Sequence, residues 1–177
     1  GIHRTDGTQP VGRGIGPALE AHDVLKVLRN AADAPADLRE RALALSAALL
    51  DMAAGSNAGT GLERARGVLD SGAALAKFLA ICEAQGGFRE PRRAVFTADV
   101  PATASGRIAV IDNRRLAKLA KLAGAPTSPT AGLENRSADR RYGRAGTTSA
   151  HPACGVAGRT GLRPGAPAGA AAHALRR

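Results

Sequence analysis

The sequence predicts an α/β fold in which a mostly helical first part precedes a smaller β-β-α unit and a disordered or frameshifted tail. Apolar residues recur at helical spacing up to Gly86. Beyond a polar joint around Pro91, β-branched residues gather into two short runs. Residues 135–177 consist largely of Ala, Gly, Arg and Pro, a composition that buries too little apolar surface to offset the entropy of ordering.

The first two helices are separated by a proline. The first helix runs from Pro17 to about Asn30, because proline suits the first helical position. Pro35 breaks the chain, and Asp37 can cap the second helix. In this second helix apolar side chains recur at alternating spacings of four and three, which predicts a narrow buried seam. The seam residues are Leu38, Ala42, Leu45, Leu49 and Met52.

A third helix follows a Gly/Ser-rich loop. Thr60 and Glu63 have the spacing of a capping box at its start. Its expected inward residues are Leu62, Ala65 and Leu69. Ser71–Gly72 interrupts the pattern before a further turn or helix, which ends at Gly86–Gly87.

The β-β-α unit begins after the joint. Val95–Val100 and Arg107–Ile111 are rich in β-branched residues and are predicted as strands. Asp112 or Asn113 then caps a helix that Gly124 ends. The expected inward residues of this helix are Leu116, Leu119, Ala120 and Ala123.

A glycine-rich turn lies close to the start of the chain. Gly12, Gly14 and Gly16 stand at every second position directly before Pro17. Glycines at this spacing let the backbone adopt positive φ and pass close to another group. Two interpretations follow: a tight structural loop that joins sheet to helix, or an anion site at the helix N-terminus.

The residues around this turn also resemble a known family. The string from Thr5 to Glu20, T-D-G-T-Q-P-V-G-R-G-I-G-P-A-L-E, is similar to a stretch of the thymidine phosphorylase family, in particular of the branch that includes the AMP phosphorylases. Gly59–Glu63, Val68–Gly72 and Gln85–Gly87 follow the family pattern in order, and the resemblance extends to about Leu133.

The resemblance implies a division into three parts. Residues 1–90 correspond to the C-terminal part of the large α/β domain, and residues 94–134 to the start of the small C-terminal α/β domain. Residues 135–177 form a basic tail that departs from the family. If the codons permitted for Arg140–Ala157 are read one base forward, they allow a string that resembles the family's own C-terminal sequence. We therefore interpret the tail as frameshifted near Leu133–Arg136, with a natural basic arm as the alternative.

The resemblance also implies phosphorolysis by a pentosyltransferase. Inorganic phosphate is the co-substrate, and the products are the free base and a (deoxy)ribose 1-phosphate. Thymidine or a related nucleoside is the expected substrate, with AMP or another nucleoside monophosphate as the alternative; no metal or other cofactor is expected. The family's catalytic and substrate-binding residues lie upstream of Gly1, so we assign no catalytic residue here and expect the chain alone to be inactive.

Candidate contacts with the substrate cleft are polar residues near the glycine turn. They are Asp6, Gln9 and Arg13. Because the family holds its phosphate elsewhere, the structural interpretation is favoured for Gly12, Gly14 and Gly16. His22 lies in the polar part of the first helix and is expected to be solvated; it is not expected to act as a general base, since the adjacent Asp23 points to another side of the helix.

Composition bounds the remaining alternatives. The net charge is +10 and the pI about 11.1. Most of the net positive charge lies in the tail, and three Phe and one Tyr provide few stacking platforms for bases. A basic nucleic-acid-binding protein or an inactive scaffold is thus the rival hypothesis. Two unpaired cysteines and no apolar run of about 20 residues favour a cytoplasmic protein without a membrane segment, and the family implies a homodimer.

Overall fold

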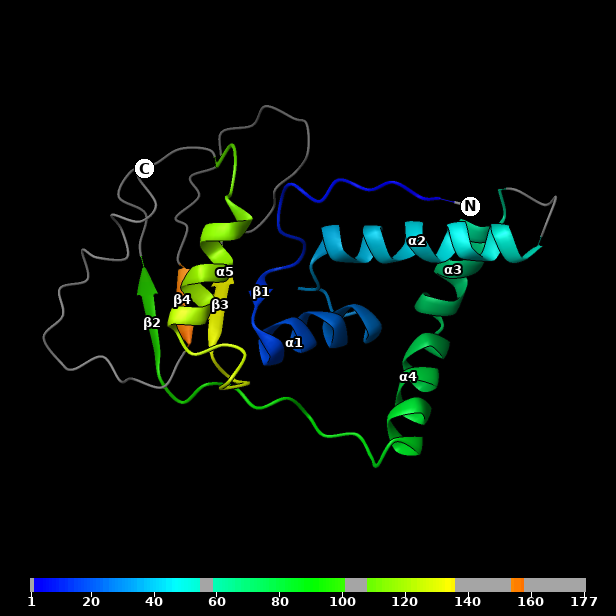
Figure 1. Ribbon diagram of the computed structural model, residues 1–177. Helices are drawn as coiled ribbons and strands as arrows, with labels where there is room; N and C mark the ends of the chain where they lie inside the picture. Colours follow the sequence, from blue (N-terminus) through cyan, green and yellow to red (C-terminus); the bar gives the residue numbers. More distant parts are fainter. Residues whose placement is uncertain (1, 55–58, 101–107, 136–153, 158–177) are drawn as a thin grey trace, which may run out of the picture. The chain divides into compact units, whose positions relative to one another are not determined.

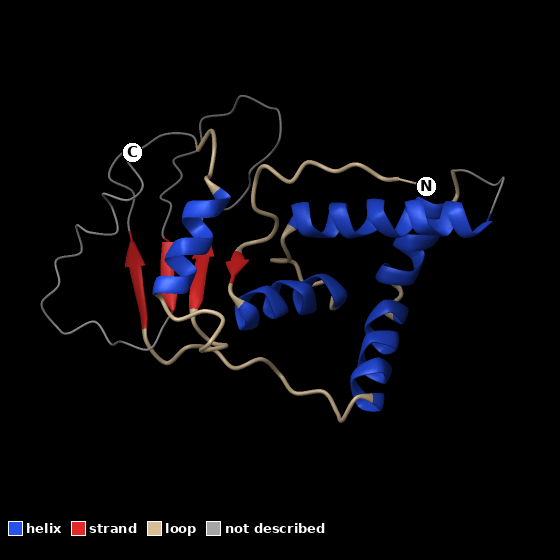
Figure 2. Cartoon of the chain, in the orientation of Figure 1, coloured by secondary structure: helices blue, strands red, loops and turns tan. Residues whose placement is uncertain are grey.

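The computed structural model of the chain describes residues 2–54, 59–100, 108–135 and 154–157. Helices and a small antiparallel sheet are combined in it, as the predicted α/β class requires (Figure 1, Figure 2). The chain forms two compact units. Unit 1 comprises Gly1–Gly7 and Ala21–Glu90, and unit 2 comprises Thr8–Glu20 and Pro91–Arg177. The domain limits inferred from the family resemblance remain predictions.

Unit 1 is helical, and its helices match those predicted. They are α1 (Pro17–Leu28, whose first turn belongs to unit 2), α2 (Ala36–Ala54), α3 (Gly61–Asp70) and α4 (Ala73–Ala84). Pro35 directly precedes α2. Gly72 separates α3 from α4, and its backbone lies in the left-handed region with a φ of 79°. Asn30, just beyond α1, also has a positive φ of 51°, a conformation that asparagine tolerates better than most residues.

The core of unit 1 lies where α1, α2 and α3 meet. Its buried residues are Val27, Leu43, Ala65 and Leu69. Leu28, Ala34, Leu38, Leu50 and Ala74 pack against them and are partly buried. Each large aliphatic side chain buried here stabilises the unit by about 1.5–3 kcal/mol.

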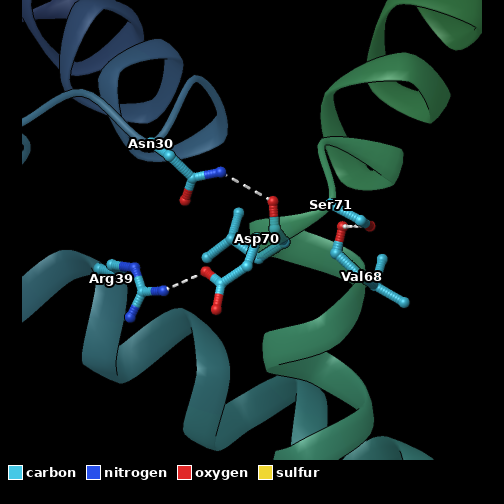
Figure 3. A network of polar contacts seen from close by, with 6 residues as sticks. Asn30, Arg39, Val68, Asp70 and Ser71 are labelled. Atoms are coloured by element: carbon cyan, nitrogen blue, oxygen red, sulfur yellow. Dashed lines mark hydrogen bonds and ion pairs between the residues drawn. The ribbon is translucent and has the colours of Figure 1, made fainter.

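Polar contacts fix the C-terminal end of α3 to the two preceding helices (Figure 3). The Asn30 side-chain amide donates to the Leu69 carbonyl oxygen at 2.9 Å. Arg39 of α2 pairs with the Asp70 carboxylate, and the Ser71 hydroxyl donates to the Val68 carbonyl at 3.3 Å. Two of the last carbonyls of α3 thus receive side-chain donors, Leu69 from Asn30 outside the helix and Val68 from Ser71 at the C-cap of α3.

The predicted seam of α2 is not its buried face. Leu43 and Ala47 are buried, whereas most of the seam is exposed. The exposed seam residues are Ala42, Leu45, Leu49 and Met52. The periodicity identified an apolar stripe correctly, but only its first member, Leu38, packs against the core, and the buried residues Leu43 and Ala47 lie on the other side of the helix. Leu62, which was expected inside α3, is likewise exposed.

Two polar side chains in unit 1 depart from simple local rules. Asp23, a carboxylate, is buried. Thr60 is the N-cap residue of α3, as predicted, but its hydroxyl forms no capping hydrogen bond within the described part of the chain. The cap comes instead from Asp51 of α2, whose Oδ1 accepts from the Gly61 N–H at 2.9 Å.

Unit 2 is a four-stranded antiparallel sheet with one helix packed on it. The strands are β1 (Gly14–Ile15), β2 (Thr97–Val100), β3 (Gly132–Asn135) and β4 (Cys154–Ala157), and their order is β1-β3-β4-β2. The helix α5 (Asn113–Leu122) packs against β3 and β1 (Figure 1). As predicted, Asp112 caps α5: its Oδ1 accepts from the Arg114 and Arg115 N–H groups at 2.9 and 3.0 Å.

The core of unit 2 is small and alanine-rich. Ala120, Ala125, Ala131 and Leu133 are buried, and Ile15, Leu116 and Leu119 pack against them. Two of the predicted inward residues of α5, Leu116 and Leu119, thus face this core and a third, Ala120, is part of it.

The strands of unit 2 differ from those predicted. The first predicted strand is present but begins at Thr97. The second prediction was wrong for its described part, residues 108–111, where no strand forms; Arg107 lies outside the described residues. The Ile111 N–H is instead bound by the Gln9 side chain. β3 was not predicted, and β4 lies within the segment expected to be disordered.

Candidate functional site

The glycine-rich turn is an edge of the sheet in unit 2. β1 pairs with β3 through Gly14 opposite Glu134 and Ile15 opposite Leu133. The Arg13 carbonyl extends this pairing by accepting a hydrogen bond of 2.8 Å from the Asn135 N–H. The turn is therefore tied to a segment that lies more than a hundred residues further along the chain.

Three glycines permit this close approach of backbones. A Cβ at Gly14 would lie within 3.0 Å of Leu19 atoms, and a Cβ at Gly16 within 3.0 Å of the Ala131 carbonyl oxygen. Gly132 on β3 would meet the Ile15 carbonyl oxygen in the same way. Because the opposing atoms are mostly backbone, they cannot rotate away, so only glycine fits.

The N-terminus of α1 is already bonded by its own chain. The Gly16 N–H donates to the Glu20 carboxylate at 3.0 Å, and the Glu20 N–H donates to the Gly16 carbonyl at 2.9 Å. The Ala18 N–H donates to the Pro129 carbonyl oxygen at 2.9 Å. The Gly16 and Ala18 N–H groups are thus used inside unit 2, and a carboxylate occupies the favourable end of the helix dipole. The geometry favours the structural interpretation of the turn.

Gln9 and Arg13 lie half-buried in unit 2, on the approach to this turn. The Gln9 Oε1 accepts a hydrogen bond of 2.9 Å from the Ile111 N–H, one residue before the α5 cap. Its Nε2 donates to the Thr8 carbonyl at 3.0 Å. Gln9 thus holds the chain that leads into α5. Asp6 is exposed and belongs to unit 1. A contact of any of these three residues with substrate stays a prediction.

Glu20 is the residue of this region that the sequence analysis did not single out. Its carboxylate and backbone N–H both bond to Gly16, which makes a reciprocal cap across the first turn of α1. The sequence signal for this contact is a carboxylate four residues after the last glycine of the turn. A capping box has a spacing of three residues, so that rule does not predict the Glu20 contact.

Titratable side chains outside the glycine turn were compared over the part of the chain that the structure describes. No group of three or more His, Cys, Asp and Glu suited to a metal ion occurs among the residues that the structure describes. His22 lies half-buried on α1, and Cys82 is a half-buried free thiol on α4. The clearest electrostatic pair is Arg29 with Glu90, joined by two hydrogen bonds of 2.8 and 2.9 Å. The hydrogen bond from Arg29 lowers the pKa of the Glu90 carboxyl.

Among the residues that the structure describes, no helix is both long enough and apolar enough to cross a bilayer.

Comparison with known proteins identifies the family. No protein-family model matches the chain. A Ralstonia nicotianae protein named "Putative thymidine phosphorylase" is 61% identical over 133 residues, which are 75% of this chain and 26% of that protein. Proteins of the same name from Hahella chejuensis and Parvibaculum lavamentivorans are 59% and 56% identical over 130 residues, 73% of this chain and 26% of each relative. The chain belongs to the thymidine phosphorylase family.

The chain spans about a quarter of the length of these thymidine phosphorylase relatives. The residues that the family resemblance assigns to substrate and phosphate are expected outside the present sequence. The described residues comprise a glycine turn that joins β1 to α1, a small sheet with α5 packed on it, and the packed helices α2 and α3.

Proposed function

We propose that this chain is part of a phosphorolytic pentosyltransferase. The full-length enzyme would use inorganic phosphate to cleave thymidine or a related nucleoside to the free base and a (deoxy)ribose 1-phosphate. The observation that carries this proposal is the 61% identity over 133 residues to a relative named for thymidine phosphorylase. AMP or another nucleoside monophosphate is the alternative substrate, which the resemblance of the glycine turn to the AMP phosphorylase branch supports. No metal or organic cofactor takes part in the proposed reaction, and the full-length enzyme would be a homodimer.

The role proposed for the present residues is to position rather than to react. Such enzymes must hold phosphate and nucleoside in line and stabilise the charge that develops on the departing base. The hydrogen bonds of Gln9 and Glu20 and the close backbone packing at Gly16 make the region around the turn a rigid support. Since the substrate-binding residues are expected upstream, the 177-residue chain alone should not turn over substrate.

The test uses a family-length chimera. This is the Ralstonia nicotianae relative in which the matched 133 residues are replaced by the corresponding residues of this chain. Thymidine, uridine and AMP are each incubated with it in phosphate buffer, and free base is measured by chromatography, with phosphate-free buffer as the control. We expect phosphate-dependent release of base from one of these substrates. The unmodified relative and the 177-residue chain are assayed in parallel.

The outcomes of this assay distinguish the proposed reaction from the inactive-scaffold hypothesis. Cleavage by the relative and the chimera supports the proposal, and the preferred substrate decides between nucleoside and nucleotide. If the relative is active and the chimera is not, this chain no longer supports the reaction, and the inactive-scaffold hypothesis is favoured. If neither protein releases base with phosphate, the proposed reaction is wrong.

A second candidate function is binding of a nucleic acid. The described feature that favours it is the outer face of α5, on which Arg114, Lys118 and Lys121 are exposed at helical spacing. A filter-binding titration with single-stranded DNA at increasing salt tests it. Charge-driven binding would weaken steeply with salt, and the double substitution Lys118→Glu with Lys121→Glu would abolish it. Unchanged binding in this variant would exclude the α5 face.

A further inference from the structure

Helix α2 is apolar on two sides, of which unit 1 uses one. Leu43 and Ala47 are 5% and 8% exposed and face α3 and the core. The residues Ala42, Leu45, Leu49 and Met52, which we call the outer seam, lie roughly opposite at about 100° per residue. Their three large members are 40%, 64% and 51% exposed. A helix with apolar residues on two opposite sides is typical of a position between two packed layers.

The spacing of the outer seam indicates what kind of surface would cover it. Successive residues of the outer seam, Ala42, Leu45, Leu49 and Met52, are three, four and three positions apart. This is the pattern of a helix that packs along another helix. Charged side chains are absent from these positions, which separates the seam from an ordinary solvated face. The partner expected is therefore an apolar ridge of similar length, such as one face of a second helix.

The size of the outer seam argues against a second copy of this chain as that partner. A buried aliphatic side chain removes roughly 60–120 Å² from water, so the seam offers at most about 500 Å². A stable interface between separate molecules needs about 800 Å² from each partner. A segment of the same polypeptide has no such threshold, because it does not lose translational freedom on docking.

The relatives supply the source of such a segment. Family members are roughly four times as long as their match to this chain, so most of a family-length protein lies outside the present sequence. We propose that the outer seam of α2 is an intramolecular docking surface for a helix from that remaining part of a thymidine-phosphorylase-family chain. The proposal rests on the family assignment and not on the reaction, so it stands or falls independently of the phosphorolysis assay.

Met52 reports directly on this surface, because it is the only methionine in the sequence. Its oxidation by hydrogen peroxide is followed by mass spectrometry in the 177-residue chain and in the chimera defined above. We expect oxidation at nearly the rate of free N-acetyl-methionine amide in the 177-residue chain at every concentration. In the chimera the rate should fall at least about tenfold, because a buried thioether is shielded from the oxidant.

Three results of the oxidation experiment would overturn the proposal. Equal, fast oxidation in both proteins would mean that nothing in a family-length chain covers the seam. Protection that grows with the concentration of the 177-residue chain would identify a second copy as the occupant. Protection at all concentrations of the 177-residue chain would mean that its own residues already cover Met52.

Matched substitutions on α2 give an independent test in the 177-residue chain. Leu49→Glu lies in the outer seam, Leu43→Glu in the core, and Ala44→Glu at an exposed position between the two faces. Leu43→Glu should lower the melting temperature strongly, whereas Leu49→Glu and Ala44→Glu should leave it unchanged. In the chimera Leu49→Glu should lower it and Ala44→Glu should not. A loss for Leu49→Glu in the 177-residue chain, or equal losses for both variants in the chimera, would contradict the proposal.

Discussion

The carboxylate of Asp51, in the last turn of α2, caps the next helix by accepting a hydrogen bond of 2.9 Å from the Gly61 N–H. It also accepts a longer bond of 3.4 Å from the Gly59 N–H. An unpaired donor at the start of α3 is thereby satisfied from outside the helix, and negative charge stands at the positive end of its dipole. The relationship links the loop after α2 to the packing of α2 on α3.

Removal of this cap should weaken unit 1. We expect Asp51→Ala to lower the free energy of unfolding by about 1 kcal/mol, as loss of other side-chain caps does. Asp51→Asn keeps an acceptor oxygen and should lose less. Urea denaturation of both variants measures the difference. If Asp51→Ala and Asp51→Asn unfold at the same urea concentration as the parent chain, the hydrogen bond has no energetic role.

Two glycines of α3 should respond to alanine in opposite directions. A Cβ at Gly61 would lie within 3.0 Å of the Ala47 carbonyl and the Asp51 carboxylate, so Gly61→Ala should destabilise unit 1 by about 1–3 kcal/mol. Gly67 has open space around it within the same helix. Gly67→Ala should therefore stabilise the chain by about 0.5–1 kcal/mol, because it restricts the unfolded backbone. Thermal melts of the two single variants compare them directly.

Asn30 combines a left-handed backbone with a hydrogen bond to α3. Asn30→Gly removes the bond to the Leu69 carbonyl but suits the φ of 51°. Asn30→Ala loses the bond and also strains the backbone. We expect both to destabilise unit 1, Asn30→Ala by about 1 kcal/mol more than Asn30→Gly. The order of their urea midpoints is the measurement, and the reverse order would show that the left-handed conformation is not retained in solution.

The pairing of β1 with β3 should depend on Gly132. Gly132→Ala places a methyl group against the Ile15 carbonyl, so we expect it to destabilise unit 2 by about 1–3 kcal/mol. Gly7→Ala, where nothing lies within 4 Å, should change stability by less than about 0.5 kcal/mol. Hydrogen exchange at the Ile15 and Leu133 amides would locate the effect. Unaltered exchange in Gly132→Ala would mean that the two strands are not in contact.

The Arg29–Glu90 pair should make unit 1 slightly sensitive to acid. Its hydrogen bond and charge lower the pKa of Glu90 below the ordinary value of 4.5 in the folded chain. A carboxyl with a lowered folded pKa contributes stability that is complete above its unfolded pKa and is lost as the pH falls through the folded one. An NMR titration of the Glu90 carboxyl should show the lowered value. Arg29→Gln should return it toward 4.5, and high salt should do so partly.

Local signals in the sequence predicted the helices well but not their partners. Asp112 and the spacing of Leu116 and Leu119 predicted both the start and the inner face of α5, because cap and stripe lie within a few residues. The seam of α2 was found by the same rule, yet periodicity cannot tell which of two apolar faces meets a partner. The Asp51 cap was missed for a related reason, since its acceptor comes from another helix.

The strands show the same limit more strongly. Residues 108–111 have strand-forming side chains, but a strand also needs an edge to pair with, and Gln9 binds the Ile111 N–H instead. β1 has two residues and no apolar alternation, so only its distant partner β3 makes it a strand. For the candidate site, the spacing of the glycines predicted a close approach of backbones as one of two interpretations. The contact between Glu20 and Gly16 was not predicted. The substrate role of Asp6, Gln9 and Arg13 stays a prediction.

The pairing of Ile15 with Leu133 has a consequence for the order of events during synthesis. β1 leaves the ribosome before its hydrogen-bonding partner β3, which is made only after the whole of Ala21–Glu90 has been translated. Unit 1 can therefore acquire its helices while the first strand of unit 2 still waits with unpaired backbone groups. Such a long-range closure is slow compared with helix formation, so the backbone groups of β1 should stay open to other strands or to a chaperone until β3 has been made.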